Sequence, residues 1–141
     1  YGAEVWTLSK LTQKRLITFE NKILRRIYGP IFEDGVWRIL KNRELENLYR
    51  RPDIVAVIRS RRIRWLGHVR RRGEDAKIRR VWRGQPEGRR QLGRPRLRWS
   101  DQVLEDVRRV GGEVDMAEDR GVWRQLVGEA KNQLGFEWPQ E

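Results

Sequence analysis

The clearest pattern of apolar positions covers residues 10–28. Ser9, a residue type that caps helix N-termini, comes directly before it, and Gly29 and Pro30 follow as a stop signal. Apolar side chains recur inside it at three- and four-residue steps, at Leu16, Phe19, Ile23 and Ile27. Because this spacing places side chains on one face of an α-helix, we predict a helix over Lys10–Tyr28 that buries this stripe.

A second strong pattern begins after Pro52, where Asp53 is a suitable helix cap. The apolar positions that fit a helical period through to about Arg71 are Ile54, Val57, Ile58, Trp65 and Val69. The basic positions expected on the other face are Arg59, Arg61, Arg62 and Arg64. The pattern therefore predicts a long amphipathic helix with a basic outer face.

Shorter repeats predict four further helices. They cover about 43–50 after Asn42, a short stretch that opens at Glu74–Asp75, a segment capped by Ser100 that ends at Gly111–Gly112, and a last segment capped by Asp119. The last one places Trp123, Leu126, Val127, Ala130 and Leu134 on one face. We find no strand-type alternation. The predicted fold class is all-α, with small helical bundles and a long basic loop at about 84–98.

The charge distribution changes this picture from a generic helical chain to one with an anionic partner. Residues 59–98 hold sixteen Arg or Lys against three acids, a net charge of +13, while the whole chain carries +12. All but Lys77 of these basic residues are arginine, whose planar guanidinium suits phosphate and base stacking. Such a concentration indicates RNA or DNA as the partner.

The basic segment leaves several local alternatives open. Trp65 falls on the apolar period, so we favour a place in the core over stacking on a base, and we favour a structural role for His68. For the seven tryptophans in general, core packing is the favoured role. The Gly93-Arg94-Pro95-Arg96 segment resembles a minor-groove hook, but contacts of this loop to backbone phosphates are the favoured interpretation.

The composition argues against several other classes of chemistry. Without Cys and with His68 alone, thiolate and imidazole zinc sites are excluded, and the carboxylates are too scattered for a two-metal catalytic centre. We expect no cofactor, no small-molecule substrate and no activity as an isolated enzyme. No apolar run approaches the roughly 20 residues that a membrane-spanning helix needs, and Gly and Pro interrupt the basic segment, which disfavours lipid binding.

Several segments in order resemble the C-terminal part of reverse transcriptases of non-LTR (LINE-type) retrotransposons. Tyr-Gly-Ala-Glu-Val-Trp-Thr-Leu at 1–8, followed by the matching positions through Gly29, is similar to the end of the thumb. The later segments that resemble arthropod-type elements lie at 42–55, 62–69, 93–99 and 119–127. The resemblance covers nearly the whole chain.

The resemblance implies a partial thumb at about 1–30 and a basic helical C-terminal region at about 31–141, with the catalytic palm upstream. The chain begins at Tyr1 rather than Met, which we interpret as a piece of a longer protein. The resemblance further implies that Lys22, Arg25 and Arg26 face a template–primer duplex, that residues 59–98 bind element RNA or target DNA, and that the protein is nuclear. The upstream polymerase domain would be a partner.

The resulting hypothesis is a fragment that grips the backbone of RNA, DNA or their hybrid. The candidate contact residues are Lys22, Arg25, Arg26, Arg59, Arg61, Arg62, Arg64, Arg70, Arg71, Arg72, Arg89, Arg90, Arg94, Arg96 and Arg98. Two alternatives stay open: a protein-interaction module whose arginine face docks on an acidic surface, and a decayed or domesticated element fragment.

Overall fold

A computed structural model describes residues 2–84, 92–93 and 97–137. The described residues form mainly helices, so the all-α prediction is confirmed. In chain order the elements are a 3-10 turn η1 (Ala3–Val5), α1 (Lys10–Tyr28), β1 (Ile31–Glu33), β2 (Val36–Arg38), α2 (Asn42–Tyr49), α3 (Ile54–Arg70), α4 (Lys77–Arg83), α5 (Trp99–Arg109), a second 3-10 turn η2 (Val114–Glu118) and α6 (Arg120–Gln133). No helix among the described residues combines the length and the apolarity that a membrane crossing requires.

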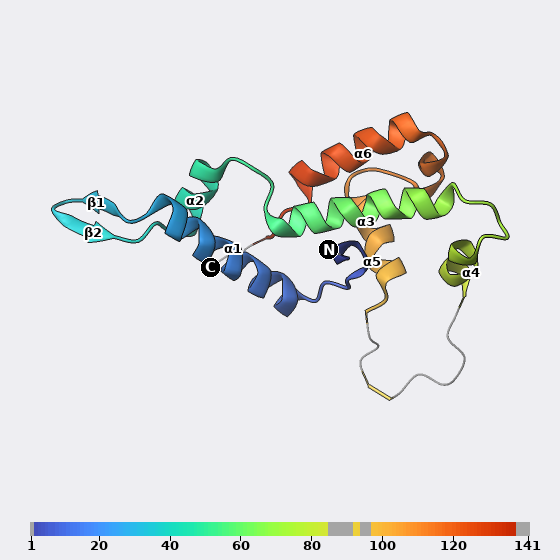
Figure 1. Ribbon diagram of the computed structural model, residues 1–141, viewed down its shortest axis with the longest axis horizontal. Coiled ribbons are helices and arrows are strands. Elements are labelled where there is room, and N and C mark those ends of the chain that lie inside the picture. Colours follow the sequence, from blue (N-terminus) through green and yellow to red (C-terminus); the bar gives the residue numbers. More distant parts are fainter. Residues whose placement is uncertain (1, 85–91, 94–96, 138–141) are drawn as a thin grey trace.

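Helix α3 is the central element: α1, α4, α5, α6 and both 3-10 turns pack against it, whereas α2 packs against α1 (Figure 1). On one side Ile63 and Leu66 are buried against Val103 of α5 and Trp123 of α6. Nearer its N-terminus, the buried residues of α3 pack on the N-terminal segment and on α1. Because neighbours cover it on several sides, α3 buries residues around much of its circumference and has no single apolar stripe.

Helices α3 and α6 approach each other closely at Gly67. The indole Nε1 of Trp123 donates a hydrogen bond to the backbone oxygen of Ile63 at 2.9 Å, and both residues are buried. A methyl group at Gly67 would overlap the indole ring of Trp123. The glycine therefore sets the separation of the C-terminal half of α3 from the N-terminal half of α6.

Three of the predicted helix caps are confirmed. Ser9 accepts a hydrogen bond from the amide of Thr12, Asp53 accepts one from Ala56, and Asp119 accepts them at the start of α6. The predicted apolar face of α6 is also confirmed, since all five of its residues are buried.

The predicted cap at Ser100 is wrong. Helix α5 begins at Trp99, after Arg98 as its cap residue. The indole of Trp99 donates to the backbone oxygen of Glu4 at 2.7 Å and packs edge-on against Trp82. These contacts with residues distant in sequence hold Trp99 at the start of the helix. A cap prediction uses only neighbouring residues and therefore cannot take them into account.

The predicted buried face of α1 is wrong as well. Phe19, Ile23 and Ile27 are 59%, 41% and 69% exposed, whereas the buried residues are Ile17, Asn21 and Leu24. The amide of Asn21 donates to the side chain of Asn42 at 3.2 Å, so a polar contact with α2 helps to select the buried face. Leu16, the remaining member of the predicted stripe, is partly buried against the core cluster that contains Leu8 and Ile17, whereas the other three members face solvent.

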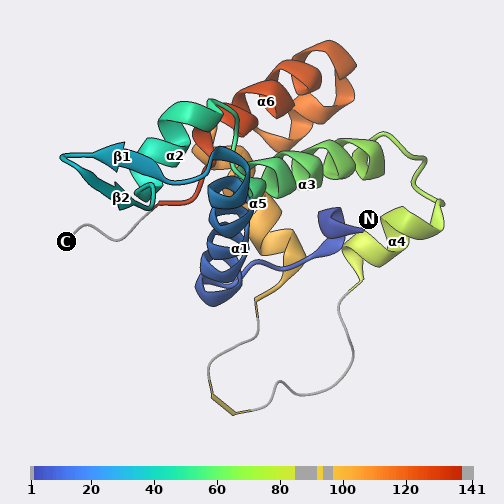
Figure 2. The same cartoon turned by 60° about the vertical axis from the view of Figure 1, so that its left-hand side comes forward.

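Residues 31–38 form a short antiparallel hairpin, although the sequence showed no strand-type alternation. Its turn consists of Asp34 and Gly35, both at positive φ (52° and 79°), which matches the Asp-Gly preference of two-residue hairpin turns. Strands of three residues are too short to show a period of two. Figures 1 and 2 show the hairpin projecting from the end of α1, away from α3.

Candidate nucleic-acid interface

A groove lies between the C-terminal half of α3 and the N-terminal half of α6. Its volume is about 620 Å³. We call it the α3–α6 groove, and it is lined by Arg64, His68, Arg71, Arg72, Arg120, Trp123, Arg124 and Val127. Among the described residues its lining therefore includes five arginines and no carboxylate.

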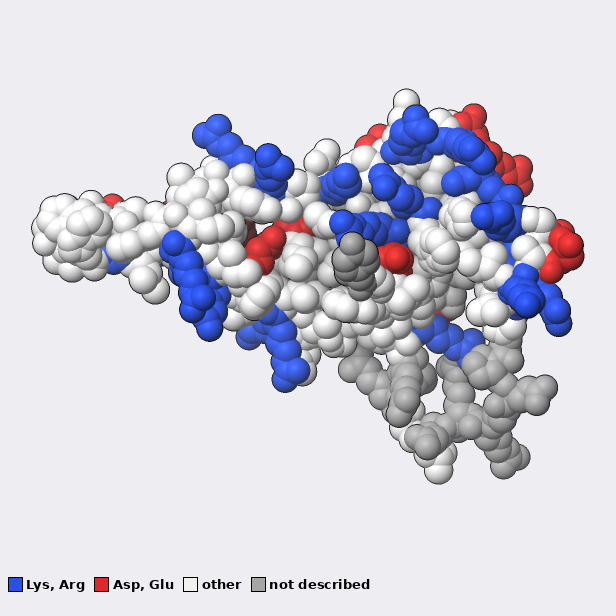
Figure 3. Space-filling model, in the orientation of Figure 1, with Lys and Arg blue, Asp and Glu red and all other residues white. Residues whose placement is uncertain are grey.

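A second groove of about 520 Å³ adjoins the first. We call it the Trp65 groove, and it is lined by Glu4, Arg61, Arg64, Trp65, His68 and Arg71. Arg64, His68 and Arg71 line both grooves, so the two form one continuous basic surface. Figure 3 shows basic side chains gathered over α3 and α6, with acidic side chains at the edge of this area.

Helical spacing explains how the arginines converge. Arg61, Arg64 and Arg71 follow one another at three- and seven-residue steps, which brings them to one side of α3 and its C-terminal cap. Arg120 and Arg124 are four residues apart on the first two turns of α6. The contact at Gly67 then brings Arg64 and Arg71 into the same groove as Arg120 and Arg124, while Arg61 lines the adjoining Trp65 groove.

These side chains have no anionic partner in the described part of the chain. None of the groove arginines, defined as Arg61, Arg64, Arg71, Arg72, Arg120 and Arg124, has an ion pair there. Burial lowers the pKa of Arg71 from its ordinary value, and the nearby charge of Arg120 lowers it further. Arg71 is held in place by donating to the backbone oxygen of Ala117 at 2.6 Å. The groove arginines repel one another, and a bound anion would reduce this repulsion.

An aromatic pair stands among the arginines. The rings of Trp65 and His68 are stacked, with centroids 5.0 Å apart and planes 21° apart, and both side chains are half-buried. The guanidinium of Arg72 lies 3.4 Å from Nε2 of His68. Trp65 therefore belongs to the groove wall rather than to the interior, contrary to the core role that its spacing favoured.

Other tryptophans divide between core and surface. Trp123 is fully buried, and Trp82 and Trp99 are partly buried against the main core, in line with the core role that we favoured. Trp6 and Trp37 are exposed, so the prediction is wrong for them. Trp138 lies outside the described residues.

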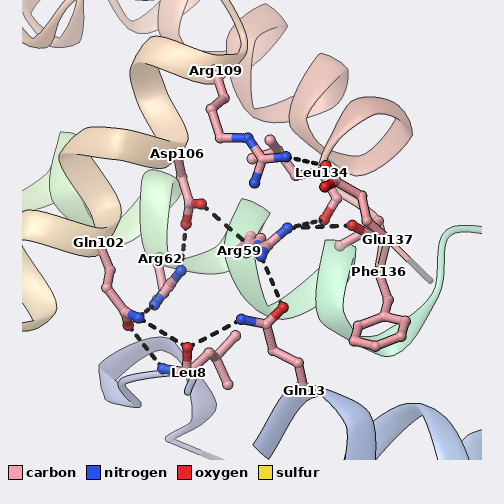
Figure 4. A network of polar contacts seen from close by, with 12 residues as sticks. Leu8, Gln13, Arg59, Arg62, Gln102, Asp106, Arg109, Leu134, Phe136 and Glu137 are labelled. Carbon is pink, nitrogen blue, oxygen red and sulfur yellow. Dashed lines mark hydrogen bonds and ion pairs between the residues drawn. The ribbon is translucent and has the colours of Figure 1, made fainter. Parts of the chain in front are cut away.

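Two predicted contact residues are not on the surface. Arg62 is 1% exposed and Arg59 is 8% exposed, so the prediction that they form part of a solvent face is wrong. Arg62 forms an ion pair with one carboxylate oxygen of Asp106, and Nε of Arg59 lies 3.6 Å from the other (Figure 4). We call these three residues the Asp106 cluster.

The Asp106 cluster ties together segments that are distant in sequence (Figure 4). Arg62 donates to Gln102 at 2.9 Å and to the backbone oxygen of Trp6 at 3.3 Å. Arg59 donates to Gln13 and to the backbone oxygen of Leu134, both at 3.0 Å. The cluster thus joins α3 to the N-terminal segment, α1, α5 and the residues after α6.

Burial governs the electrostatics of this cluster. It raises the pKa of Asp106, and the positive charges of Arg62 and Arg59 offset part of that rise. It also lowers the pKa of Arg59, against the attraction of Asp106. Each charge is tolerated in the interior because its counter-charge is present, so these two arginines serve the fold.

The remaining predicted contact residues have mixed environments. Arg70 pairs with Asp115 at 3.0 Å. Arg25 is half-buried and donates to the backbone oxygen of Leu40 at 2.9 Å and to Asn42 at 2.6 Å, whereas Lys22 and Arg26 are exposed. Arg98 is the half-buried cap residue of α5. Arg89, Arg90, Arg94 and Arg96 lie outside the described residues, as does most of the predicted loop at 84–98.

The short helix α4 has a further correction. It begins at Lys77 rather than at Glu74–Asp75. Glu74 instead forms ion pairs with Arg79, which is buried, and with Arg83. Together with Arg59, Arg62 and Arg70, five of the described arginines of the basic segment therefore have carboxylate partners, and the charge excess is more local than its sequence density indicated.

Sequence reasoning missed Arg120 and Arg124. They lie outside the +13 segment, in a region of near-balanced charge, so a count along the chain did not single them out. Their spacing of four residues beside Trp123, on a helix whose opposite face is strongly apolar, was the available signal. Within the parts of the chain that the structure describes, no group of three His, Cys, Asp or Glu residues could hold a metal ion.

Comparison with known proteins supports an origin in a mobile element. Over 136 residues the chain is 27% identical to an uncharacterized transposon-derived protein of Caenorhabditis elegans. The match covers 90% of this chain and 48% of that protein, so the chain spans about half the length of the curated relative it matches. No family model and no solved structure matches the chain.

Proposed function

We propose that this chain is a nucleic-acid-binding part of a transposon-derived protein, and that it grips the phosphate backbone with the groove arginines. The observation that carries the proposal is the continuous surface where six guanidinium groups, from α3, the two residues after it and α6, meet without a carboxylate partner among the described residues. Guanidinium forks bind phosphate oxygens bidentately, so the residue type suits a polyphosphate.

The arrangement favours backbone contacts over reading of the base sequence. The arginines come from two walls of a wide groove, and most of them are exposed, so they can follow a flexible anionic strand. Phosphate contacts of this kind fix position and affinity and carry no sequence information directly.

A finer identity follows from the resemblance together with the relative. We propose that the parent protein is a LINE-type reverse transcriptase and that this chain is its end of thumb and post-thumb region. The ordered motifs from Tyr1 to Val127 and the transposon-derived relative support this. We expect no polymerisation by this chain alone, because the palm would lie upstream.

A salt titration tests the binding proposal. If about six phosphates are neutralised, the logarithm of the affinity should fall with the logarithm of the salt concentration at a slope of about −5. Fluorescence anisotropy of labelled RNA, DNA and hybrid probes measures it. A nearly flat titration on all three probes would contradict the proposal.

Matched variants test the site. Replacing both Arg64 and Arg124 with Gln should reduce the slope to about −3, because each phosphate contact contributes about 0.9. Arg15 and Arg43 are exposed residues of α1 and α2 outside both grooves, so replacing both with Gln is the control and should leave the slope near −5. Equal effects of the two double variants would show that net charge, and not the grooves, decides the affinity.

The exposed apolar stripe of α1 favours a second contact. Phe19, Ile23 and Ile27 are exposed, and so are Phe32 and Trp37 of the hairpin that follows α1 in the chain. An exposed patch of this kind is typical of an interface. We propose that it packs against the upstream polymerase domain of the parent protein. Amide hydrogen exchange in α1 should slow when that domain is joined to the chain, and unchanged exchange would contradict this contact.

A further inference from the structure

We propose that the Trp65 groove holds an unpaired nucleobase against the Trp65–His68 stack, so that the chain prefers single-stranded nucleic acid to a duplex. The inference rests on the proposed function and adds the substrate class of the same surface. Phosphate binding alone requires cations, and it gives no reason for an accessible aromatic pair among them.

The first observation is the position of the rings. Trp65 and His68 are stacked on each other, and both line the groove while remaining only half-buried. His68 also lines the α3–α6 groove, so the pair stands where the two grooves meet. A flat ring system accessible in a groove can extend its stack onto an incoming base, because every base has a π-face.

The second observation is the charge pattern around the rings. Arg61, Arg64 and Arg71 line the Trp65 groove together with one acid, Glu4. A carboxylate repels phosphate but accepts hydrogen bonds from the amino groups of bases. In the described part of the chain, the α3–α6 groove is lined by five arginines and by no acid, which suits the phosphate backbone. The two grooves thus offer adjacent places for a base and for the phosphates beside it.

The third observation is that the stretch of α3 that carries the rings is anchored in the core. The buried residues Ile63, Leu66 and Gly67 lie beside Trp65 and His68 on α3 and pack into the main core or against Trp123. The guanidinium of Arg72, 3.4 Å from His68, covers part of the imidazole edge. Because the helix is anchored and the two rings stack on each other, a base that binds there has to order few further groups. A duplex keeps its bases inside the helix and offers no such face.

The test compares a mixed-sequence single strand with an abasic strand of the same length, which keeps the phosphates and lacks the bases. Wild-type protein should bind the base-bearing strand about 5- to 100-fold more tightly, the range that base–aromatic stacking supports. It should also bind that strand more tightly than a duplex of the same sequence. Equal affinity for the base-bearing and abasic strands would overturn the inference, as would preference for the duplex.

Substitutions locate the effect. Trp65→Leu should reduce the affinity for the base-bearing strand to that for the abasic strand and leave the abasic affinity unchanged, whereas Trp65→Phe should retain most of the difference. An equal loss for both strands would show that Trp65 only supports the arginines, which overturns the inference. If circular dichroism shows that Trp65→Leu is unfolded, the same comparison is made with His68→Ala in place of Trp65→Leu. The ring-preserving variant His68→Phe then takes the place of Trp65→Phe.

The two proposals fail in different ways. Salt-dependent binding to both strands without a base preference would leave phosphate binding standing and remove the base site. Weak and salt-independent binding to both strands would contradict the proposed function itself, and with it the base site.

Discussion

Helix α3 carries two kinds of arginine that differ in environment and not in chemistry. Arg62 is buried in the Asp106 cluster, whereas Arg61 and Arg64 on the same helix are exposed on the wall of a groove. Neighbouring residues on a helix point about 100° apart, so one turn of α3 contains both. An arginine of α3 stabilises the fold when another element supplies a carboxylate beside it. An arginine without such a partner stays free to bind a ligand. The density of arginine in the sequence does not distinguish the two.

The largest loss of stability is expected from removing the buried carboxylate of Asp106. Asp106→Ala should lower the free energy of unfolding by about 3–5 kcal/mol, because it leaves Arg59 and Arg62 buried without an anion. Chemical denaturation measures this. Asp101→Ala on the exposed side of α5 is the control and should cost less than about 1 kcal/mol. A small effect of Asp106→Ala would show that water reaches the cluster and would remove the distinction between the two kinds of arginine.

The next effect concerns the helix crossing that forms the α3–α6 groove. Gly67→Ala should destabilise the protein by about 3 kcal/mol, because the added methyl overlaps the indole of Trp123 and overpacking of this kind is costly. In Gly128→Ala, on α6, the methyl would have no neighbour within 4 Å, so thermal unfolding should show stabilisation by about 0.5–1 kcal/mol. Similar changes in stability for both variants would mean that α3 and α6 can move apart at Gly67 without loss of stability.

A paired conservative substitution compares the two kinds of arginine directly. Arg62→Lys should cost about 2 kcal/mol, because a single ammonium cannot reach Asp106, Gln102 and the backbone oxygen of Trp6 together. Arg64→Lys should change the free energy of unfolding by less than about 0.5 kcal/mol, because Arg64 is exposed and unpaired among the described residues. Denaturant titration of both variants measures these changes in the free energy of unfolding. Equal losses of stability would contradict the distinction between the buried, paired arginine and the exposed one.

The smallest effect on stability is expected from the ion pair between Arg38 and Glu44, which lies near the surface. Hydrogen bonds from Arg38 and from the amide of Lys41 lower the pKa of Glu44 from 4.5 to about 2. Because the folded state holds the ionised form, this contribution to stability is complete above about pH 4.5 and is lost as the pH falls to about 2. The difference in stability between wild type and Glu44→Gln should shrink over that interval. A constant difference would show that the pair does not act through ionisation.

The candidate site was predictable only in part. The density of arginine after Arg59 indicated a polyanion, and Arg61, Arg64, Arg71 and Arg72 do line the grooves. The same density also included Arg62, whose partner Asp106 is 44 residues away, and it left out the arginines of α6. A charge count along the chain treats all arginines alike, because it contains no information on which carboxylate comes near.

The sequence by itself determined the positions of the main helices, the caps at Ser9, Asp53 and Asp119, and the buried face of α6. These features depend on residues three or four positions apart, and such neighbours meet in any helix. Only the tertiary structure decided which face of α1 is buried, which arginines are paired, and that α3 and α6 enclose a groove. The indole of Trp123 contacts Ile63 across 60 residues, and contacts of that range form only when the whole chain has folded.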